Sequence, residues 1–144
     1  MSSQARSSTP VTVVTGAAGA IVAVSWNAAK LPRTGTAAYA ASEAAATRYV
    51  RCLGLEPAAA GVRCNVVPPG STETPVQRVL NPVAAAGREA ALRGDANTSR
   101  VGTPMGRLAE PVDVAEAVSS LLSDAARHIT TTDLLVDGGA SLRD

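Results

Sequence analysis

The two apolar runs nearest the N-terminus constrain the fold of this chain more than any other feature. Val11 to Thr15 (VTVVT) and Ile21 to Ser25 (IVAVS) each have the length and apolar character of a buried strand. Only a short glycine-containing segment, GAAGA, separates them, so no helix is expected between the two strands. That segment therefore forms either the turn of a hairpin or a tight crossover within a rewired parallel pair.

Strand and helix signals alternate along the rest of the chain. Ala37 to about Ala60 is rich in the strong helix formers Ala, Glu, Arg and Leu, and Gly61 supplies a stop. The polar stretch from Gly94 to Gly102 is predicted to be a mobile loop. Further helices are predicted over Pro82–Arg93 and Pro111–Ser123, and further strands over Val62–Val67 and Thr132–Val136.

This alternation predicts the α/β class with a parallel sheet of the doubly wound type, in which ligands bind at the carboxyl ends of the strands. At 144 residues the chain has the length of one domain. We therefore expect a single domain over residues 11–144, preceded by a disordered tail over residues 1–10.

Charge and composition argue against several kinds of partner. The net charge is +1 and no basic run is present, so nucleic-acid binding is not expected. No stretch approaches the roughly 18 apolar residues of a membrane-spanning helix, and the opening MSSQARSSTP lacks the apolar core of a signal peptide. Cys52 and Cys64 are not accompanied by clustered histidines, so no metal site is predicted. These features predict a cytoplasmic protein without membrane contacts.

Four segments carry motifs of one known family. They are Thr15–Gly19 (TGAAG), Tyr39–Glu43 (YAASE), Asn65–Thr72 (NVVPPGST) and the passage from Pro104 to Gly139 that ends in VDGG. They resemble, in turn, the nucleotide loop, the YxxxK catalytic helix, the strand end over the nicotinamide and the closing passage of the short-chain dehydrogenases and reductases. The resemblance implies a Rossmann-like fold.

Two longer stretches are similar to one group within that family. Arg63 to Arg78 and Arg127 to Gly139 most resemble 2,3-dihydro-2,3-dihydroxybenzoate dehydrogenases. Those enzymes oxidise a cyclohexadiene carboxylate with NAD.

The nucleotide-binding half departs from the family pattern. Gly19 runs directly into the expected strand at Ile21, whereas family members place a helix there, followed by several strand and helix units. The fold is therefore predicted to be a shortened Rossmann-like sheet that lacks the middle of the nucleotide-binding half. Pyrophosphate binding uses the amides and the positive dipole of a helix N-terminus, so no cofactor is expected, with NAD as the alternative.

The catalytic residues also depart from the pattern. The family serine lies thirteen residues before the tyrosine, and this position holds Trp26. The family lysine, four residues after the tyrosine, is replaced by Glu43. A carboxylate one turn from a phenol raises the pKa of that phenol, which is the wrong direction for a general base.

Tyr39 and Glu43 are nevertheless the candidate catalytic pair. Their i, i+4 spacing places them on one helix face, where they suit proton transfer in an isomerisation, dehydration or cyclisation. The alternative is that Glu43 is a solvated charge paired with Arg48 or Lys30. The candidate substrate-binding residues are Trp26, Arg33, Pro69, Gly70, Thr72 and Arg78.

The first functional hypothesis is therefore a cofactor-free acid/base enzyme acting on a small cyclic or aromatic metabolite in secondary metabolism. The alternatives are a non-catalytic partner, or pseudoenzyme, of a full-length relative and a residual NAD-dependent dehydrogenase of the dihydroxybenzoate type. A mean hydropathy of +0.12 is high for a small domain and suggests a homodimer or homotetramer.

Overall fold

The computed structural model describes residues 12–16, 19–74 and 84–141. Its main sheet has the order β1-β2-β3, formed by Thr12–Gly16, Ala20–Val24 and Arg63–Val67. β1 pairs antiparallel with β2, and Gly16 lies opposite Ala20. β2 and β3 are parallel, from Ala20 opposite Arg63 to Val24 opposite Val67. The glycine segment is thus a hairpin turn, which settles the choice left open by the sequence.

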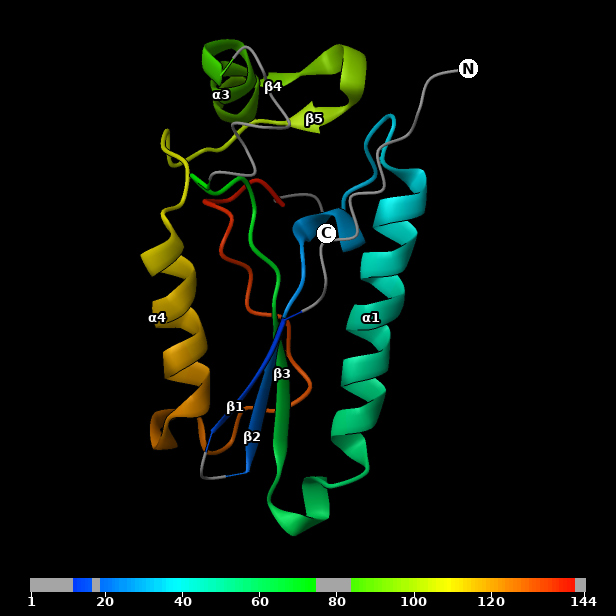
Figure 1. Ribbon diagram of the computed structural model, residues 1–144, viewed down its shortest axis with the longest axis vertical. Helices are drawn as coiled ribbons and strands as arrows, with labels where there is room; N and C mark the ends of the chain where they lie inside the picture. Colours follow the sequence, from blue (N-terminus) through cyan, green and yellow to red (C-terminus); the bar gives the residue numbers. More distant parts are fainter. Residues whose placement is uncertain (1–11, 17–18, 75–83, 142–144) are drawn as a thin grey trace.

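Two helices cover opposite faces of this sheet, α1 (Ala37–Leu55) and α4 (Pro111–Leu122) (Figure 1). Successive residues of a strand point to opposite faces, so Val22 packs on the α4 side and Ala23 on the α1 side. Burial on both faces explains why β2 is continuously apolar rather than alternating. The α4-side cluster is Val22, Val67, Val118, Leu121 and Ala126, and the α1-side cluster is Ala23, Val50, Cys64 and Val66.

The segment over residues 132–136 runs parallel to β3, as expected, but as isolated bridges rather than a continuous strand. Val66 bridges Asp133 and Pro69 bridges Val136. The amides of Val66 and Gly70 donate to the carbonyls of Thr132 and Val136 at 2.9 and 3.0 Å. The predicted α/β class with a shortened Rossmann-like sheet is confirmed, with antiparallel β1 as the addition.

The helix predictions hold with small changes at their ends. α1 ends at Leu55, two residues before Pro57, which lacks the amide that would continue it. A short 3-10 helix, η2 (Ala58–Ala60), follows and stops at Gly61. α3 spans Ala84–Arg93, while the expected start at Pro82 and the tail over residues 1–10 lie outside the described residues. None of the described helices is long and apolar enough to cross a bilayer.

The stretch from Gly94 to Gly102, predicted to be a mobile loop, contains two short strands. β4 (Gly94–Asp95) and β5 (Arg100–Val101) pair antiparallel around η3 (Ala96–Thr98). Asp95 holds the turn, because its carboxylate accepts from the amide of Asn97 at 3.0 Å and from the hydroxyl of Thr98 at 3.0 Å. This hairpin lies with α3 beyond the carboxyl ends of β2 and β3 (Figure 1).

Candidate active site

Tyr39 and Glu43 lie one turn apart on α1, and their side chains interact. The phenol of Tyr39 and the backbone amide of Trp26 both donate hydrogen bonds to the Glu43 carboxyl group. Glu43 is only 3% exposed, so it is not the solvated charge of the alternative interpretation. Burial raises the pKa of Glu43, although the bonds from Tyr39 and Trp26 partly oppose that rise. The predicted pair is therefore a buried carboxyl group in contact with a half-buried phenol.

Trp26 links this pair to a cation. It lies two residues after the end of β2, and its ring centroid is 5.1 Å from that of Tyr39, with the two planes tilted by 52°. The guanidinium carbon of Arg33 lies 5.1 Å from the centroid of the same indole. Aromatic and cation–π contacts of this kind fix the relative orientation of the groups involved. The structure thus brings together Trp26, Arg33, Tyr39 and Glu43.

Arg33 belongs to the loop between η1 (Asn27–Ala29) and α1. Its Nη2 atom donates to Oδ1 of Asn27 at 3.3 Å, whereas its buried Nε has no hydrogen-bond partner among the described residues. Burial lowers the pKa of Arg33, the positive charge of Arg100 lowers it further, and Asp137 opposes both. A buried donor without a partner costs free energy, so this guanidinium is suited to receive an anion.

The strand end after β3 lies next to this group. The amide of Asn27 donates to the carbonyl of Pro69 at 3.0 Å. A Cβ atom on Gly70 would come within 2.7 Å of the Asp137 Cβ, so only glycine fits there. The hydroxyl of Thr72 donates to the carbonyl of Gly70 at 3.3 Å. Pro69, Gly70 and Thr72 remain predicted substrate-binding residues, and Arg78 lies outside the described residues.

Sequence reasoning missed Arg100. Its Nη2 atom donates to Oγ of Ser71 at 2.9 Å, and burial lowers its pKa. No local pattern signals this placement, because it depends on how the β4–β5 hairpin packs against the strand end. The sequence also missed Asn27, which is fully buried and orients Arg33.

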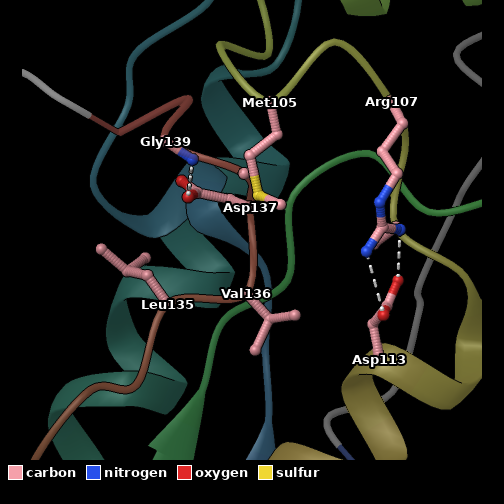
Figure 2. Close-up of a pocket in the computed structure, with 9 residues that line it drawn as sticks. Met105, Arg107, Asp113, Leu135, Val136, Asp137 and Gly139 are labelled. Carbon is pink, nitrogen blue, oxygen red and sulfur yellow. Dashed lines mark hydrogen bonds and ion pairs between the residues drawn. The ribbon is translucent and has the colours of Figure 1, made fainter.

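Another cavity lies between the segment before α4 and the C-terminal segment. It has a volume of about 400 Å³, and segments 105–113 and 135–139 line it (Figure 2). Arg107 in its wall is already paired with Asp113 at 2.8 Å, and this contact lowers the pKa of Asp113. A second cavity of about 210 Å³ lies beside Arg33 and is also lined by Lys30, Leu31, Pro32, Ser99 and Val101. We assign the candidate site to the smaller cavity, because it is lined by Arg33, whose guanidinium contacts the ring of Trp26.

The turn between β1 and β2 does not fit the pyrophosphate of a dinucleotide. Gly19 has φ of 67°, and β2 begins at the next residue. A Cβ atom at Gly19 would lie 3.4 Å from Cγ2 of Val62, so this glycine packs against protein. A strand rather than a helix N-terminus follows the turn, and the amides and dipole that bind a phosphate are therefore missing at this point.

Comparisons with known proteins show what this chain resembles. A family profile described as enoyl-(acyl carrier protein) reductase matches residues 2–141. The chain is 50% identical over 124 residues to a 2,3-dihydro-2,3-dihydroxybenzoate dehydrogenase of Bacillus subtilis, covering 86% of this chain and 47% of that protein. It is 47% identical to the enzyme of that name from Escherichia coli, covering 86% of this chain and 50% of that one.

Solved structures have the same fold. An oxidoreductase of the short-chain dehydrogenase/reductase family from Burkholderia thailandensis matches with a TM-score of 0.75 and 34% identity, covering 88% of this chain and 46% of that chain. A 3-ketoacyl-(acyl-carrier-protein) reductase from Brucella melitensis, complexed with NADH, matches with a TM-score of 0.67 and 33% identity, covering 85% and 44%. The chain thus spans about half the length of the relatives it matches.

These relatives correct two predictions. The hypothesis of a cofactor-free acid/base enzyme is wrong, because the relatives at 47–50% identity are named dehydrogenases. The expectation of no cofactor is contradicted as well, since they are dehydrogenases and a solved relative is complexed with NADH. Nothing in the relatives supports a role in secondary metabolism. Because the profile spans residues 2–141 and solved relatives share the fold, the chain belongs to the short-chain dehydrogenase/reductase family.

Proposed function

We propose that this chain oxidises a hydroxyl group of a small cyclic carboxylate, of the 2,3-dihydro-2,3-dihydroxybenzoate type, in an NAD-linked dehydrogenase reaction. The observation that carries the proposal is the contact of the Tyr39 phenol with the buried Glu43 carboxyl group, beside the ring of Trp26. The names of the relatives support the reaction type and the substrate class.

Tyr39 and Glu43 provide a route for the proton. Oxidation of an alcohol releases the hydroxyl proton, and a phenol in contact with the substrate can take it up while passing its own proton onward. Glu43 is the acceptor in this relay, because it already accepts the hydrogen bond of Tyr39. Since burial raises the pKa of Glu43, its carboxylate is a stronger base than a solvated glutamate.

Trp26 and Arg33 bind the substrate in this proposal. Trp26 stands where the family has a serine, so the substrate ring is held by stacking on the indole rather than by a hydroxyl group. Arg33, 5.1 Å from that indole, has a buried Nε atom to offer to the carboxylate. The ring and the acidic group of the substrate are thus recognised by neighbouring side chains.

NAD is expected to bind weakly to this chain. In dehydrogenases of this kind NAD accepts the hydride. Here the turn between β1 and β2, at residues 16–20, does not fit the pyrophosphate of NAD. Without those contacts, we expect half-saturation only at roughly millimolar NAD.

The test is NADH formation from NAD and 2,3-dihydro-2,3-dihydroxybenzoate. Tyr39→Phe should lower turnover at least about 100-fold, because the proton route is lost. Tyr49→Phe is the matched control, since Tyr49 lies on the same helix and is 67% exposed. The proposal fails if the wild-type protein makes no NADH at saturating NAD, or if Tyr39→Phe turns over as fast as the control.

We also propose a homodimer or homotetramer in which α1 contributes to the contact. Tyr49 and Leu55 on this helix are 67% and 68% exposed, which leaves apolar surface in water. Light scattering should give a mass above that of one chain, and Leu55→Glu should reduce it.

A further inference from the structure

Two arginines from distant parts of the chain interact electrostatically at the candidate site. Arg33 comes from the loop before α1, and Arg100 comes from β5. The charge of Arg100 contributes to the lowered pKa of Arg33, as does burial. Like charges that are half-buried side by side repel each other, so this arrangement is unfavourable unless an anion offsets it.

The protein holds both guanidinium groups in place with neutral acceptors. Arg33 donates to Oδ1 of Asn27 at 3.3 Å, and Arg100 donates to Oγ of Ser71 at 2.9 Å. Among the described residues, neither arginine forms a salt bridge within 4.0 Å. The Nε atom of Arg33 is buried without a hydrogen-bond partner in the same part of the chain.

Nearby carboxylates form no direct ion pair with either arginine, although Oδ2 of Asp137 is buried without a hydrogen-bond partner among the described residues. Asp137 raises the pKa of Arg33, but its Oδ1 atom accepts the amide of Gly139 at 3.0 Å. Asp95 raises the pKa of Arg100, but it accepts from the Asn97 amide and the Thr98 hydroxyl. These acids reduce the net positive charge without occupying the arginine donors in direct ion pairs.

A backbone hydrogen bond joins the β4–β5 hairpin to the loop that carries Arg33. The amide of Thr34 donates to the carbonyl of Thr98 at 3.1 Å, which joins the loop carrying Arg33 to the turn before Arg100. The cavity of about 210 Å³ lies at this junction, with Arg33 on one side and Ser99 and Val101, the neighbours of Arg100, on the other. Arg33 thus lines the cavity itself, whereas Arg100 extends from β5 to Ser71, the residue that follows Gly70.

We propose that Arg33 and Arg100 together bind the carboxylate of the ring substrate, and that the β4–β5 hairpin thereby selects acidic rings over neutral ones. The inference rests on the proposed function and adds Arg100 to it as a residue that determines specificity. Two guanidinium groups match the two oxygens of a carboxylate, and charge-assisted bonds of this kind are roughly twice as strong as neutral ones.

The test compares 2,3-dihydroxybenzoate with catechol, which has the same hydroxyl groups and no carboxylate. Their affinities are measured by calorimetry for the wild type, Arg100→Gln and the control Arg127→Gln, an exposed arginine outside the site. Arg100→Gln should weaken binding of the acid about tenfold and leave catechol unchanged. Arg127→Gln should change neither affinity.

Every other result contradicts the inference, and the outcomes differ in what else they contradict. If wild type and Arg100→Gln bind the acid with equal affinity, Arg100 has no role in binding, but the proposed function is not contradicted. If Arg100→Gln lowers the affinities for 2,3-dihydroxybenzoate and catechol equally, Arg100 has a structural role rather than a role in selecting acids. Inorganic phosphate and another carboxylic acid are also compared as competitors of 2,3-dihydroxybenzoate. If phosphate displaces it as effectively as the other acid does, the arginines form a phosphate site instead. If the folded wild type binds neither ring, the proposed function falls together with this inference.

Discussion

The two ends of the β1–β2–β3 sheet differ in how far they keep the form that the family motifs imply. At the end where β1 turns into β2, the TGAAG segment resembles a nucleotide loop, yet Gly16 pairs with Ala20 in a hairpin. At the carboxyl ends of β2 and β3, the family segments fold together, and Trp26, Arg33 and Tyr39 meet there. The comparison shows that the glycines of a family motif can be present while the helix N-terminus that favours phosphate binding does not follow them.

The role of glycine also differs between the two ends, and this gives the largest expected effect. A Cβ atom on Gly70 would come within 2.7 Å of the Asp137 Cβ and 2.9 Å of its Cα, so backbone must move. Gly70→Ala should cost about 3 kcal/mol of unfolding free energy. Gly19→Ala should cost about 1 kcal/mol, for its left-handed φ. Urea denaturation measures the free energy of unfolding of both variants. A larger decrease for Gly19→Ala than for Gly70→Ala would contradict the comparison.

Replacing two residues of the proposed site should lower activity. The double variant Trp26→Ser, Glu43→Lys removes the indole that stacks on the substrate ring and the carboxylate that accepts the proton from Tyr39. We expect turnover to fall about 100-fold, which corresponds to a barrier about 2.7 kcal/mol higher. Glu116→Lys, on the exposed surface of α4, serves as the control. Unchanged turnover in the folded double variant would show that this end of the sheet does not limit the reaction.

Arg63 at the start of β3 has a structural role at the glycine end of the sheet. It donates to the carbonyls of Leu121 and Ser123 at 2.7 and 3.3 Å, and so caps the last turn of α4. Arg63→Met should cost about 2 kcal/mol, because it leaves these carbonyl groups without their donor. Thermal denaturation measures the loss against Arg127→Met, and equal stability of the two variants would argue against the cap.

The smallest expected effect is a pH dependence due to Glu43. Its pKa is raised in the folded protein, so the folded state holds this proton to higher pH than the unfolded chain. The resulting stability is fully present below the ordinary pKa of a glutamate and is lost as the pH rises through the raised value. Glu43→Gln should remove this decline, and Glu116→Gln should retain it. Urea midpoints over this pH range test the assignment, and a decline retained in Glu43→Gln would refute it.

Much of the candidate site followed from spacing along the chain. The i, i+4 positions of Tyr39 and Glu43 predicted one helix face, and the structure joins their side chains by a hydrogen bond. Arg100 escaped prediction because its position depends on the docking of a hairpin whose polar sequence suggested a mobile loop. The prediction of cofactor-free chemistry was wrong because lost motif residues do not specify a new reaction, and the relatives at 47–50% identity are named dehydrogenases.

The central claim is that the carboxyl ends of β2 and β3 bind an acidic ring while the β1–β2 turn does not bind a pyrophosphate. Calorimetric titration of the wild-type protein with 2,3-dihydroxybenzoate and, separately, with ADP tests both halves of the claim directly. The account predicts saturable binding of the acid and no binding of ADP at the same concentrations. Tight binding of ADP, lost in Gly19→Ala and accompanied by no binding of the acid, would contradict it.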